Sequence, residues 1–162
     1  INIHVGGAYG DHKSTAERWI KTWHRLSDGL KSRLVLENDD KPSMWSTRML
    51  YNYFHKEIGI PITFDYHHHT FHPDELTEQE ALELAGSTWP KDVRQCCHYS
   101  ESRAKEKQDP KIRAQAHSDY IKDEINTYDH ELDIVIEAKA KELALFEYRN
   151  IYQYNNNKKV LV

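Results

Sequence analysis

Five short runs of apolar and β-branched residues recur along the chain. They lie at residues 1–5, 34–37, 60–65, 93–98 and 132–137. Runs of this length that are apolar on both faces are typical of buried strands in a parallel sheet. The pattern therefore predicts five such strands, of which the fourth is the least regular because Arg94 and Gln95 interrupt it.

Helical periodicity fills most of the segments between these runs. Helices are predicted to begin at a capping box over residues 14–17, at Ser46, and at a second capping box over residues 77–80 that opens a helix through Leu84. A last helix is predicted over residues 139–154. The charged and polar segment 100–110 is predicted to be a long loop.

Strand, loop and helix thus alternate with a period of about 30 residues, which is the signature of an α/β protein with right-handed crossovers. This rhythm suits an open doubly wound sheet or part of a (β/α)8 barrel. A complete barrel needs about 250 residues. With 162 residues and five strands, the chain would supply only part of one.

Composition narrows the class of protein. The formal net charge of −4 indicates neither a globally basic nucleic-acid binder nor an acidic tail. No apolar run approaches the roughly 18 residues of a membrane span, and no signal-peptide pattern opens the chain. Cys96 and Cys97 are adjacent, which excludes a disulfide framework and favours a reducing compartment such as cytoplasm or nucleus. The 11 histidines are the unusual feature.

Acidic and imidazole residues end every predicted strand. They are His4, Glu37, Asp65, His98 and Glu137. Because the carboxyl ends of parallel strands meet at one rim, these five side chains are expected to gather there. Burying such groups without basic partners costs several kcal/mol each, roughly, unless they are coordinated. The spacing therefore predicts bound divalent cations.

The mixture of carboxylate and imidazole donors suits Mn, Zn or Fe in an open catalytic site. A carboxylate such as Glu37 can bridge two ions, an arrangement that activates water and stabilises both oxygens of a phosphoryl displacement. His68 and His117 are candidate ligands of a further ion. Residues 67–69 are three consecutive histidines; if they continue the third strand, alternate side chains face opposite sides and not all three can ligate.

Several motifs resemble those of the UV damage endonuclease family. They occupy residues 3–7, 10–13, 34–41, 59–61, 64–69, 98–100, 117–120 and 136–142, in family order from Ile1 to about Leu145. The most specific are Glu37-Asn38-Asp39-Asp40-Lys41 and the triple histidine.

The resemblance implies a metal-dependent TIM-barrel nuclease, similar in architecture to endonuclease IV, that nicks damaged double-stranded DNA 5′ to ultraviolet photoproducts. It implies Mn²⁺ as cofactor, with Zn²⁺ or other divalent ions as alternatives, at two or three ions per site, and no membrane partner. By motif, the implied metal ligands are His4, Glu37, Asp65, His68, His98, His117 and Glu137. Glu37 and Lys41 take the catalytic roles, and Tyr9 and Lys139 are the residues implied to bind substrate.

The chain resembles only the later part of the family barrel, about its last five β/α units. Residues 1–154 are predicted to be the C-terminal portion of the endonuclease domain and residues 155–162 a polar tail. The missing N-terminal half-barrel, or another copy of the chain, is expected to complete the barrel. Cys96 stands where the family often has a lysine that helps to hold metal.

Two other readings remain open on the residues alone. One is a metal-dependent TIM-barrel sugar isomerase or epimerase, which shares the donors at strand ends. The other is a non-catalytic half-barrel remnant that acts as an interaction module.

Overall fold

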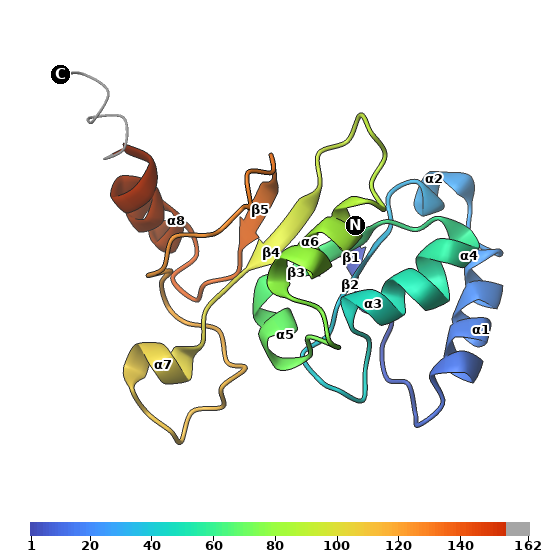
Figure 1. Cartoon of the computed structure of the whole chain (residues 1–162), viewed down its shortest axis with the longest axis horizontal. Coiled ribbons are helices and arrows are strands. Elements are labelled where there is room, and N and C mark those ends of the chain that lie inside the picture. Colours follow the sequence, from blue (N-terminus) through green and yellow to red (C-terminus); the bar gives the residue numbers. More distant parts are fainter. Residues whose placement is uncertain (155–162) are drawn as a thin grey trace.

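The computed structural model describes residues 1–154, so the predicted tail at 155–162 lies outside the described residues. Its centre is one parallel sheet whose strands follow chain order, as Figure 1 shows. The strands are Asn2–Ile3 (β1), Val35–Glu37 (β2), Ile62–Asp65 (β3), Cys96–Tyr99 (β4) and Asp133–Ile136 (β5). All five predicted strands are therefore present.

Helices connect the strands. They are His12–Trp23 (α1), Asp28–Lys31 (α2), Thr47–Leu50 (α3), Lys56–Ile58 (α4), Tyr66–Phe71 (α5), Glu78–Gly86 (α6), Arg103–Lys107 (α7) and Glu142–Tyr148 (α8), with π-helical turns at Tyr51–His55 (η1) and Arg149–Tyr154 (η2). Among residues 1–154, no helix is long and apolar enough to cross a membrane.

Two of the predicted helix starts are confirmed. The Ser46 hydroxyl accepts a hydrogen bond from the Met49 amide at 3.1 Å and caps α3. At α6 the Thr77 hydroxyl accepts from the Glu80 amide at 3.2 Å, while the Glu80 carboxylate accepts from the Thr77 amide at 2.8 Å. Both caps satisfy amide groups that the first helical turn leaves free.

The first helix begins earlier than predicted. The cap of α1 is Asp11, whose carboxylate accepts from the Ser14 amide at 2.9 Å, so Ser14 lies inside the first turn. The last helix begins later, at Glu142, because the backbone of Lys141 is not helical, with φ 52° and ψ −124°. Periodicity reveals neither the Asp11 cap nor this backbone turn.

The segment 100–110 was predicted to be entirely loop, and this is wrong: α7 forms within it. All five residues of α7 are good helix formers. Glu106 also holds the helix against a distant segment, since its carboxylate accepts hydrogen bonds from the amides of Asp119 and Tyr120.

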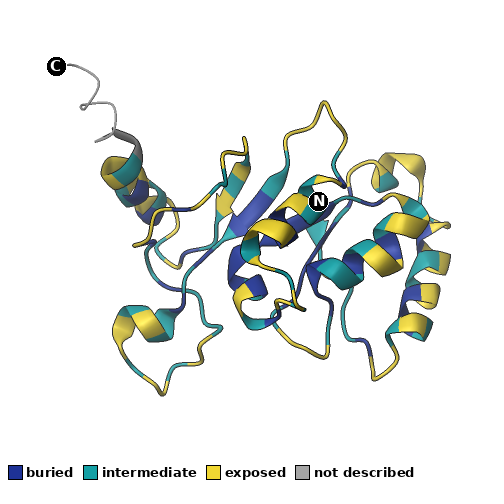
Figure 2. Ribbon diagram, in the orientation of Figure 1, coloured by how far each residue is buried: buried dark blue, intermediate teal, exposed yellow. Residues whose placement is uncertain are grey.

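The core lies between the sheet and the helices that cover it. Leu36, Ile62 and Phe64 from β2 and β3 are fully buried there, together with Trp45 and Phe54 from the segment that includes α3 and η1. Figure 2 shows the buried residues concentrated along the central strands and the inner sides of the helices.

The two outer strands are less buried than predicted. Both residues of β1 are half-buried, and β5 alternates exposed and half-buried positions, with Val135 47% exposed. The expectation of strands buried on both faces therefore holds for the centre of the sheet and fails at both edges. The alternation along β5 shows that one of its two faces is left exposed.

Candidate metal centre

The parallel pairing brings the donor residues to one rim of the sheet. Asp65 pairs in register with His98. Glu37 ends β2, and His4 and Glu137 directly follow β1 and β5. This is the common rim that the spacing along the chain predicts.

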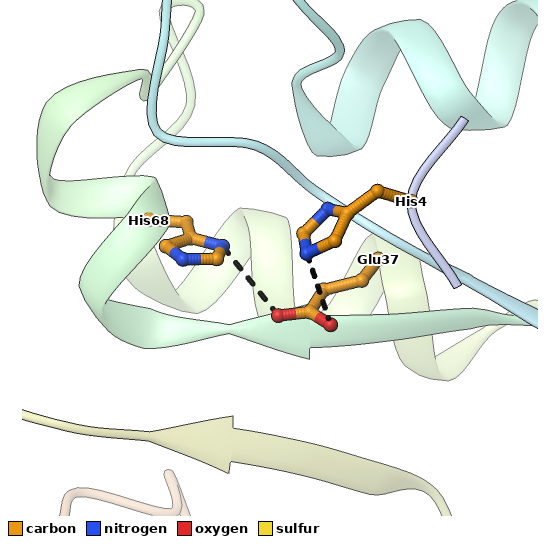
Figure 3. Close-up of side chains that lie close together, drawn as sticks. All are labelled: His4, Glu37 and His68. Carbon is orange, nitrogen blue, oxygen red and sulfur yellow. Dashed lines mark ion pairs between the residues drawn. The ribbon is translucent and has the colours of Figure 1, made fainter. Parts of the chain in front are cut away.

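The first group of possible ligands comprises His4, Glu37 and His68. Glu37 Oε2 lies 3.6 Å from Nε2 of His4, and Glu37 Oε1 lies 3.5 Å from Nδ1 of His68. Figure 3 shows the two imidazoles approaching the carboxylate from different sides. One donor atom of each residue lies within 4.8 Å of the others, a spacing that can hold a metal ion.

The second group comprises Glu37, Asp65 and His98, all buried, with donor atoms again within 4.8 Å of one another. His98 Nδ1 lies 3.4 Å from Glu37 Oε1. Among the described residues, Asp65 Oδ2 is buried and has no hydrogen-bond partner. Because buried polar atoms are normally satisfied, this orphaned oxygen fits a site that a cation completes.

Glu137 and His117 extend the cluster on its open side. Glu137 Oε1 lies 3.1 Å from His98 Nδ1, and Glu137 Oε2 lies 3.6 Å from His117 Nδ1. The same His117 nitrogen lies 3.0 Å from the Glu137 carbonyl oxygen. All seven residues that the resemblance implies as ligands thus lie in one continuous cluster.

The electrostatics of the cluster favour bound positive charge. Burial opposes the ionisation of Glu37, but His98, His4 and Asn2 lower the pKa of its carboxyl to about 2. Burial also disfavours a charged His98, yet Glu137 and Glu37 raise its pKa to about 10. Burial raises the pKa of Asp65 to about 7. The carboxylates of Glu37 and Glu137 thus share the positive charge of His98. A divalent cation would outcompete this imidazolium for the same carboxylate oxygens.

Three positioning residues around the cluster were not identified from the sequence. The Asn38 side chain accepts from the Asp65 amide at 2.8 Å and donates to the Asp65 carbonyl at 3.0 Å. Asn2 donates from Nδ2 to Glu37 Oε2. The Asp39 carboxylate lies 3.0 Å from His4 Nδ1. The polar residues that directly follow Glu37 in the sequence could have indicated two of them, Asn38 and Asp39.

The three consecutive histidines lie in α5 and do not continue β3, so that premise is wrong. Asp65 Oδ1 accepts from the His68 amide at 2.8 Å and starts the helix. The helical turn separates the rings: His68 faces Glu37, His67 Nε2 contacts the Gln115 carbonyl at 3.2 Å, and His69 packs beside Phe64.

Tyr9, Lys41 and Lys139 are exposed on the loops that follow β1, β2 and β5. Within residues 1–154 none of their side chains forms a hydrogen bond or ion pair with the cluster. Cys96 lies two residues before His98 on the same face of β4 and is half-buried, and burial raises the pKa of its thiol.

The family model described as UV-endonuclease UvdE matches residues 1–161. The UV-damage endonuclease of Schizosaccharomyces pombe is 39% identical over 164 residues, covering 95% of this chain and 26% of that protein. The UV DNA damage endonuclease of Bacillus cereus strain B4264 is 35% identical over 156 residues, covering 91% and 46%.

A solved structure, the crystal structure of SacUVDE, superimposes with a TM-score of 0.79 at 28% identity, covering 96% of this chain and 52% of that one. This likeness confirms the predicted α/β fold as part of a TIM barrel. The chain spans about half the length, or less, of the relatives that it matches.

Proposed function

This chain belongs to the UV-endonuclease UvdE family, and we propose that it carries the metal centre of a DNA repair endonuclease that nicks the backbone 5′ to ultraviolet photoproducts. The family model, the relatives and the solved structure reported above all bear UV-endonuclease names. Neither a sugar isomerase nor a non-catalytic remnant is favoured by them.

The observation that carries the proposal is that Glu37 belongs to both groups of possible ligands. Its Oε2 faces His4, whereas its Oε1 faces His68 and His98. One buried carboxylate that two groups of donors share suits two neighbouring divalent ions, which is the arrangement used for phosphodiester hydrolysis.

The donor set fits the ions that we propose. His4 and His68 with Glu37 would hold one ion, Asp65 and His98 with Glu37 a second, and His117 with Glu137 a third. Nitrogen and carboxylate donors without thiolates suit both Mn²⁺ and Zn²⁺. Of the two, Mn²⁺ is the ion that the family resemblance implies. When bound, such ions supply an activated water and neutralise charge on the phosphodiester.

The protein's own groups then have distinct roles. Glu37 would hold the two neighbouring metal ions together. Asp39 and Asn38 fix the orientation of His4 and Asp65. From their exposed loops, Lys41 would approach the phosphate that is cut, and Tyr9 and Lys139 the flanking backbone. The partner is damaged duplex DNA, and the rest of the barrel would come from an N-terminal half-barrel or a second copy.

A plasmid-nicking assay tests this proposal. Supercoiled plasmid, irradiated or not, is incubated with Mn²⁺ and either the wild-type chain, Glu37→Gln or the control Glu57→Gln, which changes an exposed carboxylate on α4. Nicked circles are expected only from irradiated plasmid, and only with wild type and the control. The proposal fails if neither the wild-type chain nor a version extended at its N-terminus nicks, if both plasmids are cut equally, or if Glu37→Gln cuts at the wild-type rate.

A further inference from the structure

The segment 103–116, here called the basic loop, leaves the sheet after β4 and returns to the metal centre at His117. Ser102 and His117 form an antiparallel bridge at its base. The Arg103 amide donates to the Ala116 carbonyl at 2.7 Å, and the Ser118 amide donates to the Glu101 carbonyl at 2.8 Å. Figure 1 shows α7, which begins this loop, standing away from the sheet.

Polar contacts hold the loop in one place. Glu106 accepts from the amides of Asp119 at 2.9 Å and Tyr120 at 3.0 Å. The Asp119 carboxylate lies 2.6 Å from Lys107 Nζ and 3.8 Å from an Arg103 guanidinium nitrogen. The excursion is therefore anchored at its base, and a ligand that contacts its tip does not have to order it first.

Positive charge is concentrated on the basic loop. It carries five basic and two acidic residues in a chain whose formal net charge is −4. Two of the basic residues are paired with Asp119. The other three, Lys105, Lys111 and Arg113, are exposed and make no ion pair within the part of the chain that the structure describes.

The loop also lies close to the metal centre. His117, at its base, contacts Glu137 through Nδ1. Arg113 precedes His117 by four residues, so its Cα lies at most about 14 Å away along an extended chain. On the other side, the Lys139 amide donates to the Ser118 carbonyl at 2.9 Å, which places Lys139 beside the same base.

We propose that the basic loop binds the phosphate backbone of duplex DNA beside the cleaved bond, with Lys111 and Arg113 as its main contacts. This inference rests on the proposed function, because DNA held at the metal centre presents its flanking phosphates within that reach. Exposed, unpaired cations are the groups that neutralise DNA phosphates and release their counterions. Such contacts position the duplex and carry no sequence information.

The test is DNA binding without metal. Affinity of the 162-residue chain for an undamaged duplex is measured by fluorescence anisotropy in EDTA, from 50 to 200 mM KCl. The variant Lys111→Ala/Arg113→Ala is compared with Lys21→Ala/Arg25→Ala, which removes the same charge from exposed positions at and just beyond the end of α1. Circular dichroism checks that each variant is folded.

Loss of two phosphate contacts should reduce the slope of log K against log salt by about 2. It should also weaken binding at least tenfold at 100 mM salt, while the α1 variant stays within twofold of wild type. Equal losses in both variants, an unchanged slope, or no salt-dependent binding by wild type would overturn the proposal. Because no metal is present, the result is independent of nicking: a chain that binds through this loop but never nicks would refute only the nuclease.

Discussion

Replacing Glu37 with Gln should abolish metal binding at two sites at once. The substitution keeps the size of the side chain and removes the charge that both ligand groups share. His4→Ala should empty only the group that contains His68, and Asp65→Asn only the group that contains His98. A shared carboxylate therefore predicts that Glu37→Gln loses both metal sites whereas His4→Ala and Asp65→Asn each lose one. Independent sites would not produce this pattern.

The size of the effect follows from linkage. An ion at 100 times its dissociation constant stabilises the folded chain by about 2.7 kcal/mol per site. In a protein of this size each kcal/mol shifts Tm by about 2–4 °C. For the two sites that share Glu37, saturating Mn²⁺ should raise the Tm of wild type by about 10–20 °C, of His4→Ala and Asp65→Asn by about half as much, and of Glu37→Gln by almost nothing. An ion at His117 and Glu137 would add the same increment to all four proteins.

The assay is differential scanning calorimetry with and without Mn²⁺, and the measured quantity is the shift within each variant. Absolute Tm values would mislead, because the lowered pKa of Glu37 means that its ionised carboxylate also stabilises the metal-free fold at neutral pH. Glu57→Gln serves as the control and should keep the wild-type shift. If Glu37→Gln retains as large a shift as His4→Ala, the carboxylate is not shared and the two-ion reasoning is refuted.

Three further outcomes are expected. Metal binding should strengthen as pH rises from 6 through 9 and should release protons, because the raised pKa values of Asp65 and His98 keep both groups protonated at lower pH. Titration calorimetry in buffers of different ionisation enthalpy measures the affinity and the protons released; a pH-independent affinity would contradict this. Asn38→Ala should cost about 2–4 kcal/mol in denaturant unfolding, since it leaves the buried amide and carbonyl of Asp65 unpaired, whereas Asn52→Ala, on the surface, should change little. Cys96→Lys should alter bound Mn²⁺ or nicking, measured by elemental analysis and the plasmid assay; an unchanged profile would place residue 96 outside the metal shell.

The strands and the common rim were predictable because both depend on short-range facts. An apolar run such as 60–65 has no low-energy alternative to burial, and a parallel sheet then fixes where Asp65 points. The two capping boxes illustrate the limit of local signals. Thr77 caps α6 as predicted, whereas Asp11 displaces Ser14 at α1 because either side chain can satisfy the free amides.

Features that depend on contacts across the chain were not predictable. The helix α5 forms because Asp65 both ends β3 and caps the next turn, so one residue has a structural and a candidate chemical role. The helix α7 is held against a distant segment by Glu106, which reaches the amides of Asp119 and Tyr120. With six and five residues, α5 and α7 are too short to show a hydrophobic period, and their contact partners are visible only in the folded structure.

Exposure within the cluster indicates which part of the metal centre is fixed by this chain. The side chains of Glu37, Asp65 and His98 are at most 10% exposed, whereas those of His4 and Glu137 are 41% and 33% exposed. The buried three come from β2, β3 and β4, which have neighbours on both sides, and the exposed two follow the edge strands. Rigid, desolvated donors lose little entropy on binding an ion. The group containing Asp65 should therefore bind its ion more tightly than the group containing His4, because its geometry depends only on strands that the sheet already encloses.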